Sequence, residues 1–130
     1  MAGELILIVE DNEKNRKLVR DVLQFKGYRT TEAETAELGL TFARESRPAL
    51  ILMDIQLPGM SGIDALGHLR ADPATRDIPV MAVTASAMTQ DRQKILAAGF
   101  DAYQSKPIDV KAFLAQVAEM LAAGPRGGAR

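Results

Sequence analysis

Hydrophobic residues fall into short, uninterrupted runs that alternate with longer segments of mixed polarity. Three runs, residues 4–9, 50–53 and 78–83, hold almost only apolar side chains, which is typical of strands covered on both faces in a parallel sheet. Segments 28–31 and 102–104 are shorter and more mixed, and we expect the first of them to be an edge strand. The pattern therefore predicts five strands.

The segments between these runs predict helices. Apolar residues at positions 18, 19, 22, 23 and 25 recur at helical spacing. Asp11 or Asn12 can cap this first helix, and Gly27 ends it. We expect four further helices, at residues 35–45, 63–70, 89–98 and 110–121. The last of these is amphipathic, with apolar residues at positions 110, 113, 114, 117, 120 and 121.

Five strands that alternate with five helices predict an α/β fold, in which a doubly wound, five-stranded parallel sheet carries helices on both faces. Right-handed crossovers leave few arrangements, and we expect the flavodoxin-like (βα)5 fold with strand order 2-1-3-4-5. This order places the first and third strands side by side, and ligands bind at the carboxyl ends of such strands. Glu10 and Asp11 would then lie next to Asp54, although 43 positions separate Asp11 from Asp54.

Composition and charge narrow the class of protein. At 130 residues the chain suits one domain, which we expect over residues 1–123, followed by a Gly/Arg/Pro-rich tail at 124–130 that we expect to be disordered. The net charge of −1 argues against an intrinsic nucleic-acid binder. The absence of cysteine excludes disulfides, thiol nucleophiles and cysteine-bound zinc. Because no apolar run approaches the ~18 residues of a membrane span and no signal peptide is recognisable, we expect a cytoplasmic protein without a membrane partner.

Polar side chains stand where the predicted strands end. Glu10 and Asp11 follow the first strand, Asp54 the third, Thr84 the fourth and Lys106 the fifth. Three crowded carboxylates repel one another and need a compensating positive charge. Mg²⁺ supplies such a charge, because it binds one or two carboxylates together with water and phosphate oxygens. Carboxylates, a cation and a lysine indicate phosphoryl chemistry, which depends mainly on positioning and charge neutralisation.

Each of these residues also has a plainer explanation. Asp11 alone fits a helix cap, Thr84 a turn residue and Lys106 a solvated loop charge, while Asp54 alone fits a loop residue that accepts backbone N–H groups. Their joint occurrence at the strand ends favours the functional interpretation. It leaves two roles open for Asp54, which would be either a metal ligand only or the nucleophile that accepts the phosphoryl group.

Four motifs resemble the receiver domain of bacterial two-component response regulators, the CheY-like superfamily. They are VEDN (9–12), LILMDIQLPGMSG (50–62), VTASA (83–87) and AYQSKP (102–107), and the resemblance spans about residues 4–122. Among receivers, the chain is most similar to stand-alone cell-cycle regulators of the DivK kind and to receivers of hybrid histidine kinases.

The resemblance implies a phosphoaspartate switch in a two-component phosphorelay. Asp54 would accept a phosphoryl group from phosphohistidine on a sensor histidine kinase or a histidine phosphotransfer protein. Glu10, Asp11 and Asp54 would hold the Mg²⁺ cofactor together with the backbone carbonyl of Gln56. Lys106 would pair with the phosphoryl oxygens.

The resemblance also implies how the signal leaves the site. Thr84 would bond to the phosphoryl group, and Tyr103, which occupies the position of the switch aromatic, would turn inward on phosphorylation. The peptide bond between Lys106 and Pro107 would be cis. The surface that senses phosphorylation would be formed by the fourth helix, the fifth strand and the fifth helix.

Three features of the chain depart from the family pattern or shape the site. Glu10 stands where relatives often have aspartate, and its longer side chain can reach Mg²⁺ through water. Ala49 stands where many relatives have aspartate, but it lies at the far end of its strand and should not affect the chemistry. Ala85 and Ser86 are small, which should leave the phosphoryl site open to a partner or to water.

Other functions compete with this one. A phosphatase of the haloacid-dehalogenase type needs a general acid two residues after the nucleophile, where this chain has Gln56. A flavodoxin-like cofactor binder needs a phosphate loop after the first strand, where Glu10 and Asp11 would repel a phosphate. A non-phosphorylated interaction module would not need the complete set of polar residues. A receiver cut from a hybrid histidine kinase remains an open alternative.

We therefore expect a single-domain signalling protein that catalyses only its own phosphotransfer and dephosphorylation. After residue 123 seven residues remain, too few for an output domain. The expected output is contact with a downstream protein target or onward transfer of the phosphoryl group, without direct binding of nucleic acid. We expect the kinase to dock on the first helix, at Asn15, Arg16 and Val19.

Overall fold

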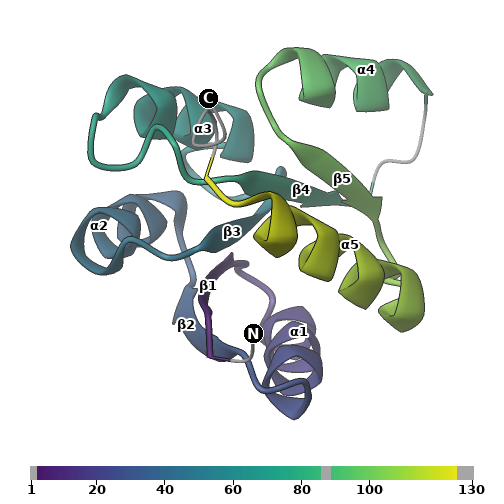
Figure 1. Cartoon of the computed structure of the whole chain (residues 1–130). Coiled ribbons are helices and arrows are strands. Elements are labelled where there is room, and N and C mark those ends of the chain that lie inside the picture. Colours follow the sequence, from purple (N-terminus) through teal and green to yellow (C-terminus); the bar gives the residue numbers. More distant parts are fainter. Residues whose placement is uncertain (1–2, 86–88, 126–130) are drawn as a thin grey trace.

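The computed structural model describes residues 3–85 and 89–125, with side chains described for these residues except 89–91. Strands and helices alternate along the described chain (Figure 1). The elements are β1 (Leu5–Val9), α1 (Glu13–Phe25), β2 (Arg29–Ala33), α2 (Ala36–Ser46), β3 (Leu50–Asp54), α3 (Gly62–Ala71), β4 (Val80–Thr84), α4 (Thr89–Ala97), β5 (Ala102–Ser105) and α5 (Val110–Ala123). Ser86 and residues 126–130 of the expected tail lie outside the described residues.

All strand pairs are parallel, and the order in the sheet is β2-β1-β3-β4-β5. The predicted fold class and strand order are therefore confirmed. In the register of the sheet, Val9 of β1 lies beside Met53 of β3, and Asp54 lies beside Val83 of β4. The residues that follow β1 thus start next to the last residue of β3.

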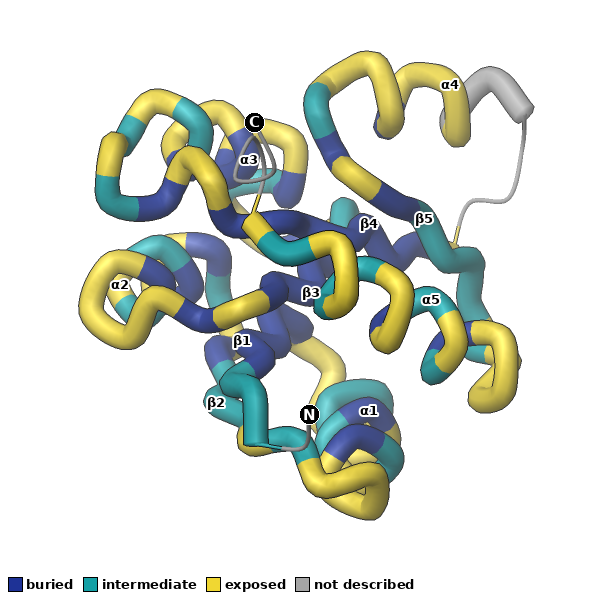
Figure 2. The backbone as a smooth tube through the Cα atoms, viewed as in Figure 1, coloured by how far each residue is buried: buried dark blue, intermediate teal, exposed yellow. Residues whose placement is uncertain are grey.

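Helices cover both faces of the sheet and enclose two hydrophobic clusters. α1 and α5 bury Val19, Leu23, Phe113 and Val117 against one face. α2, α3 and α4 cover the opposite face. Figure 2 shows the central strands β1, β3 and β4 buried between the layers, whereas the edge strands β2 and β5 are mostly half-buried and the outer sides of the helices are exposed. Every residue of β3 and β4 is buried, which explains why these strands lack polar alternation.

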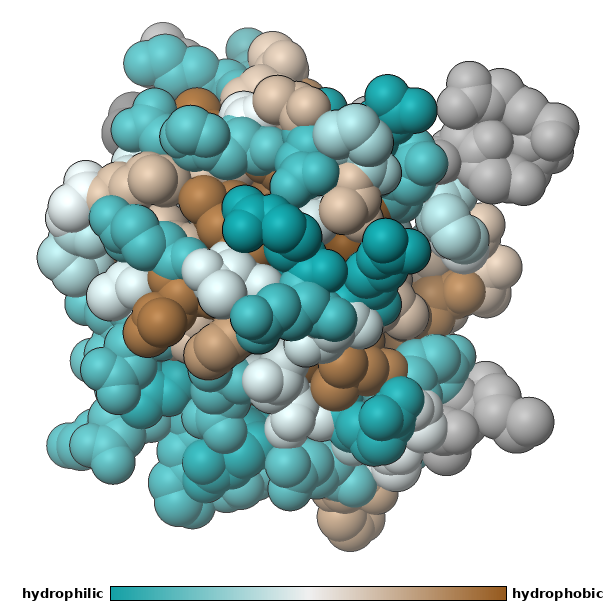
Figure 3. Space-filling model, turned by 90° about the vertical axis from the view of Figure 1, so that its left-hand side faces the viewer, coloured by the Kyte–Doolittle hydropathy of each residue, from teal (hydrophilic) through white to brown (hydrophobic). Residues whose placement is uncertain are grey.

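The side of the molecule that carries α2 is mostly hydrophilic, and its hydrophobic groups form small, separate patches (Figure 3). α2 packs closely on β1 because Gly39 has no side chain. A Cβ atom at Gly39 would lie 2.8 Å from Cγ2 of Val9, which is closer than van der Waals contact allows. Gly39 therefore permits the approach of α2 to the last residue of β1, immediately before the acidic pair.

The starts of β2 and β4 lie one and two residues later than predicted, in each case because a local hydrogen bond competes. The amide of Tyr28 donates to the carbonyl of Leu23 at 3.2 Å, so Tyr28 closes the end of α1 and β2 begins at Arg29. The amide of Ile78 donates to the carbonyl of Thr75 at 3.0 Å, so Ile78 belongs to a turn although it is buried. β4 accordingly begins only at Val80.

The apolar face of α1 is narrower than the sequence pattern suggested. Val19 and Leu23 are buried, whereas Leu18 is 46% exposed and Phe25 is 87% exposed. An α-helix turns by about 100° per residue, so Phe25 points to nearly the opposite side from Leu23.

Among the described residues, no helix combines the length and apolar composition needed to cross a membrane.

Candidate functional site

Three carboxylates meet where β1 and β3 end. Glu10 and Asp11 follow the last residue of β1, and Asp54 is the last residue of β3. One carboxylate oxygen from each of the three lies within 4.8 Å of the others. Glu10 and Asp54 are buried, and Asp11 is exposed. The strand order therefore brings together the residues that the sequence predicted to meet.

Lys106 connects the two buried carboxylates. Its Nζ atom lies 2.8 Å from Oε1 of Glu10 and 3.0 Å from Oδ2 of Asp54. The backbone amide of Lys106 donates to the carbonyl of Thr84 at 2.7 Å, which joins the segment after β5 to the end of β4. The peptide bond between Lys106 and Pro107 is cis. One ammonium group thus compensates two carboxylates at the carboxyl edge of the sheet.

Backbone amides hold the remaining oxygens of these carboxylates. The amide of Asn12 donates to Oε2 of Glu10 at 3.1 Å, and the amide of Gln56 donates to Oδ1 of Asp54 at 3.0 Å. Asn12 also caps α1, because its side chain accepts the amide of Asn15. Both buried side chains are therefore fixed by a charged partner and by the backbone of a following loop.

The environment shifts the ionisation of this cluster. Burial raises the pKa of Glu10 to about 7, and the nearby Asp54 adds to the rise against the opposing hydrogen bonds from Lys106 and Asn12. Burial alone would lower the pKa of Lys106, but its hydrogen bonds to Glu10 and Asp54 outweigh burial and raise this pKa above its ordinary value. The cluster retains its ammonium charge while one carboxylate titrates near neutral pH.

The loop after β3 depends on a glycine that lies against the backbone of Asp54. A Cβ atom at Gly62 would lie 2.5 Å from the carbonyl oxygen of Asp54. The amide of Gly62 also donates to the carbonyl of Ile55 at 3.0 Å. Gln56 lies in this loop and is exposed; the role of its carbonyl as a metal ligand stays a prediction.

Thr84 and Tyr103, the two residues predicted to form the switch, lie on neighbouring strands. Thr84 ends β4 and is buried, beside Ser105 in the register of the sheet. Tyr103 lies within β5 and packs partly buried against the hydrophobic cluster beneath α2, α3 and α4. Ser86, which belongs to the VTASA motif, lies outside the described residues.

Two of the three residues of α1 that we expected to contact a kinase, Arg16 and Val19, have little exposed surface. Val19 is only 7% exposed, so it cannot offer an appreciable surface to a kinase. The guanidinium of Arg16 points inward and donates from Nη1 to the backbone carbonyl of Glu10 at 2.9 Å. The sequence pattern did not predict this contact. The signal that could have indicated it is the position of Arg16 one turn after the cap Asn12, on the side of the helix that faces the end of β1.

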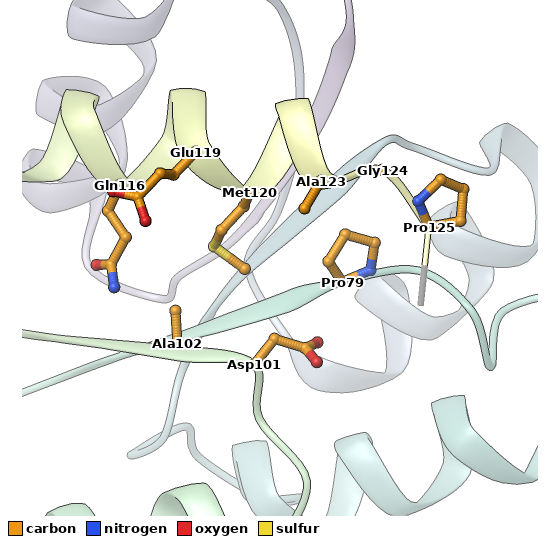
Figure 4. Close-up of a pocket in the computed structure, with 9 residues that line it drawn as sticks. All are labelled: Pro79, Asp101, Ala102, Gln116, Glu119, Met120, Ala123, Gly124 and Pro125. Carbon is orange, nitrogen blue, oxygen red and sulfur yellow. The ribbon is translucent and has the colours of Figure 1, made fainter. Parts of the chain in front are cut away.

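Large hollows lie away from these carboxylates. A pocket of about 330 Å³ opens beneath α5 near the starts of β4 and β5 (Figure 4). The carboxylate of Asp101 in this pocket has a structural role. Its Oδ2 atom accepts hydrogen bonds from the amide of Val80 at 2.8 Å and from a guanidinium nitrogen of Arg70 at 2.9 Å. A smaller hollow of about 100 Å³ adjoins the carboxylate cluster and is lined by Glu10, Asn15, Leu18, Val19, Lys106, Pro107 and Ile108.

The raised pKa of Glu10 predicts how stability depends on pH. Between its ordinary value of 4.5 and about 7, the folded state holds a proton on Glu10 that the unfolded state releases. The stability from this group is therefore complete below pH 4.5 and is lost as the pH rises through 7.

We expect the wild-type protein to lose on the order of 2 kcal/mol of unfolding free energy relative to Glu10→Gln between pH 5 and pH 8, without divalent cations. Urea unfolding of both proteins across this range measures the difference. Parallel curves would contradict the prediction.

Comparison with known proteins identifies the family. The response regulator receiver domain family matches residues 6–118. The polar-differentiation response regulators DivK of Brucella anthropi and Brucella ovis are each 47% identical over 116 residues, which cover 89% of this chain and 94% of each relative. The chain thus matches nearly the whole length of these relatives.

Solved structures agree with this assignment. The receiver domain of sensor histidine kinase PA1611 from Pseudomonas aeruginosa PAO1, which has a magnesium ion coordinated in its active-site cleft, superposes with a TM-score of 0.86 at 33% identity and covers 93% of this chain and 99% of that chain. A CheY-like receiver domain protein from Methanospirillum hungatei JF-1 gives a TM-score of 0.85 at 30% identity, over 94% of this chain and 96% of that chain. With the carboxylate cluster at the expected edge of the sheet, the chain belongs to the response regulator receiver family and is a phosphoaspartate signalling domain.

Proposed function

We propose that Asp54 is the phosphoacceptor of a two-component phosphorelay, with phosphohistidine of a sensor kinase or phosphotransfer protein as the donor. The observation that carries this proposal is the position of the Asp54 carboxylate, at the end of a buried strand with Lys106 at 3.0 Å and two further carboxylates nearby. Receiver domains take phosphoryl groups from histidine kinases. The proposal assigns that reaction to Asp54.

The donor set fits Mg²⁺. Glu10, Asp11 and Asp54 present oxygen atoms close enough to share one ion, and hard divalent cations prefer oxygen ligands. The backbone carbonyl of Gln56 is the further ligand that we propose. When bound, Mg²⁺ neutralises charge that develops on the transferred phosphoryl group.

Asp54 and Lys106 promote transfer of the phosphoryl group by holding the reacting atoms in place. One carboxylate oxygen of Asp54 bonds to phosphorus while the bond from phosphorus to the imidazole nitrogen breaks. The electron pair of that bond stays on the imidazole, which leaves in its neutral form after taking up one proton. Lys106 is held where it can pair with the phosphoryl oxygens, since its ammonium already lies beside Asp54.

The switch residues provide the response. We assign to the Thr84 hydroxyl a bond to the phosphoryl group, because Thr84 ends the strand beside Asp54. Movement of Thr84 would free space into which Tyr103 turns, and the surface formed by α4, β5 and α5 would then bind a downstream protein. In this role the domain catalyses only its own phosphorylation and dephosphorylation, within residues 1–123.

Docking of the donor is best placed at the hollow beside Lys106. Leu18, Pro107 and Ile108 line this hollow between α1 and the loop after β5. Leu18 is 46% exposed, so it offers the contact that the buried Val19 cannot. The donor histidine would reach Asp54 past this apolar rim.

Intact mass measurement tests the assignment of Asp54. Incubation with acetyl phosphate and Mg²⁺ is expected to add one phosphoryl group to the wild-type protein, because the small donor needs no docking surface. Asp54→Asn and a sample without Mg²⁺ are the controls, and both are expected to show no adduct. An equal adduct on Asp54→Asn would show that another residue is the acceptor.

The docking surface is tested with two exposed apolar residues of the same helix. Leu18→Ala is expected to slow transfer from a phosphorylated cognate donor by about tenfold, which corresponds to a loss of about 1.4 kcal/mol at a central contact of the docking surface. Phe25→Ala is the matched control, since Phe25 is 87% exposed but lies two helical turns, about 10 Å, farther along α1 and does not line the hollow. Transfer from acetyl phosphate should stay unchanged in both variants. Equal slowing by the two substitutions would disprove this placement.

A further inference from the structure

The side chain of Arg16 joins α1 to the ends of β1 and β2. Nη1 donates to the backbone carbonyl of Glu10 at 2.9 Å, Nε lies 3.2 Å from Oε1 of Glu32, and Nη2 lies 3.9 Å from Oε1 of Glu34. The side chain is only 13% exposed. We propose that Arg16 is a positioning residue of the metal site, an inference that rests on the proposed function of that site.

The contact with the Glu10 carbonyl acts on the peptide unit that joins the acidic pair. This unit connects Glu10 to Asp11, so its orientation sets where the Asp11 side chain begins. On the other side, the amide of Glu10 donates to the carbonyl of Ala33 at 3.0 Å. The two contacts hold the chain from both sides of Glu10. Because Asp11 is exposed, its position depends on this backbone more than on packing of its side chain.

The carboxylates of Glu32 in β2 and of Glu34, which follows β2, balance the positive charge of the Arg16 guanidinium. A cation next to a site for Mg²⁺ would oppose binding of the ion. Glu32 and Glu34 offset the charge of Arg16, and Arg20 also pairs with Glu32 at 3.3 Å. Arg16 therefore supplies a hydrogen-bond donor of fixed geometry to the Glu10 carbonyl, and adds little net positive charge near the metal site. The planar guanidinium can serve the carbonyl and Glu32 at the same time, which the single ammonium of a lysine cannot do in the same geometry.

Arg20 provides a matched control, because it shares Glu32 with Arg16 but makes its described contacts with Glu32 and Asp21 only. The experiment compares Arg16→Gln, Arg16→Lys and Arg20→Gln with the wild-type protein. Titration with Mg²⁺ alone gives the dissociation constant of the ion, and urea unfolding gives the stability of each variant. Acetyl phosphate at saturating Mg²⁺ and a phosphorylated cognate donor give two rates of phosphorylation.

Arg16→Gln is expected to weaken Mg²⁺ binding by about tenfold, as loss of a group that orients a metal ligand does in other sites. Arg16→Lys should not restore the affinity, and Arg20→Gln should stay within about twofold of the wild-type value because it leaves the Glu10 carbonyl bound. At saturating Mg²⁺, phosphorylation of Arg16→Gln by acetyl phosphate should recover most of the wild-type rate.

Equal dissociation constants for Arg16→Gln and Arg20→Gln would overturn the proposal. A loss of stability in Arg16→Gln with unchanged Mg²⁺ affinity would overturn it as well, since it would assign Arg16 a structural role only. Slower transfer from the cognate donor alone would make Arg16 a docking residue instead. If the wild-type protein bound Mg²⁺ but accepted no phosphoryl group, the proposed function would fail, whereas the comparison of affinities would still decide the role of Arg16.

Discussion

The sharing of one ammonium group by two buried carboxylates is the interaction on which this site depends. Glu10 and Asp54 would repel each other at the edge of the sheet, and burial removes the water that would screen them. Lys106 lies between them at hydrogen-bonding distance from both. The negative charge of the cluster exceeds the positive charge of Lys106, because Asp11 adds a third carboxylate nearby. The remaining negative charge explains why the site suits a divalent cation and, after it, a phosphoryl group held by Lys106.

The sheet creates this arrangement from distant parts of the chain. Placing β1 between β2 and β3 sets the end of the first strand beside the end of the third, and β5 reaches the same edge through β4. Two close backbone approaches make the placement tight. Gly39 lets α2 lie against Val9, and Gly62 lets the loop after β3 fold back on Asp54. Arg16 adds a link to β2 through Glu32. The chemistry at the edge therefore depends on elements from most of the chain.

Much of this was predictable because the central strands are covered on both faces. Continuous apolar runs reveal β1, β3 and β4, and their order follows from parallel topology, so the meeting of Glu10, Asp11 and Asp54 could be predicted. Contacts that depend on the direction of one side chain could not. Arg16 looked like a surface residue, since an amphipathic pattern does not show whether a long side chain turns inward. Leu18 and Phe25 share the apolar character of Val19 but lie beyond the edge of the buried stripe. The limits of β2 and β4 depend on single competing hydrogen bonds.

Lys106 and a bound cation compensate the same negative charge, that of the Glu10 and Asp54 carboxylates. The most direct measurement is the dissociation constant of Mg²⁺ for Lys106→Met and for the wild-type protein, at low salt and at pH 8.5, where Glu10 is ionised in the wild-type protein. Lys106→Met is expected to bind Mg²⁺ several-fold more tightly, because the ion is no longer repelled by an ammonium group beside Glu10 and Asp54. Unchanged or weaker binding by Lys106→Met would contradict the account.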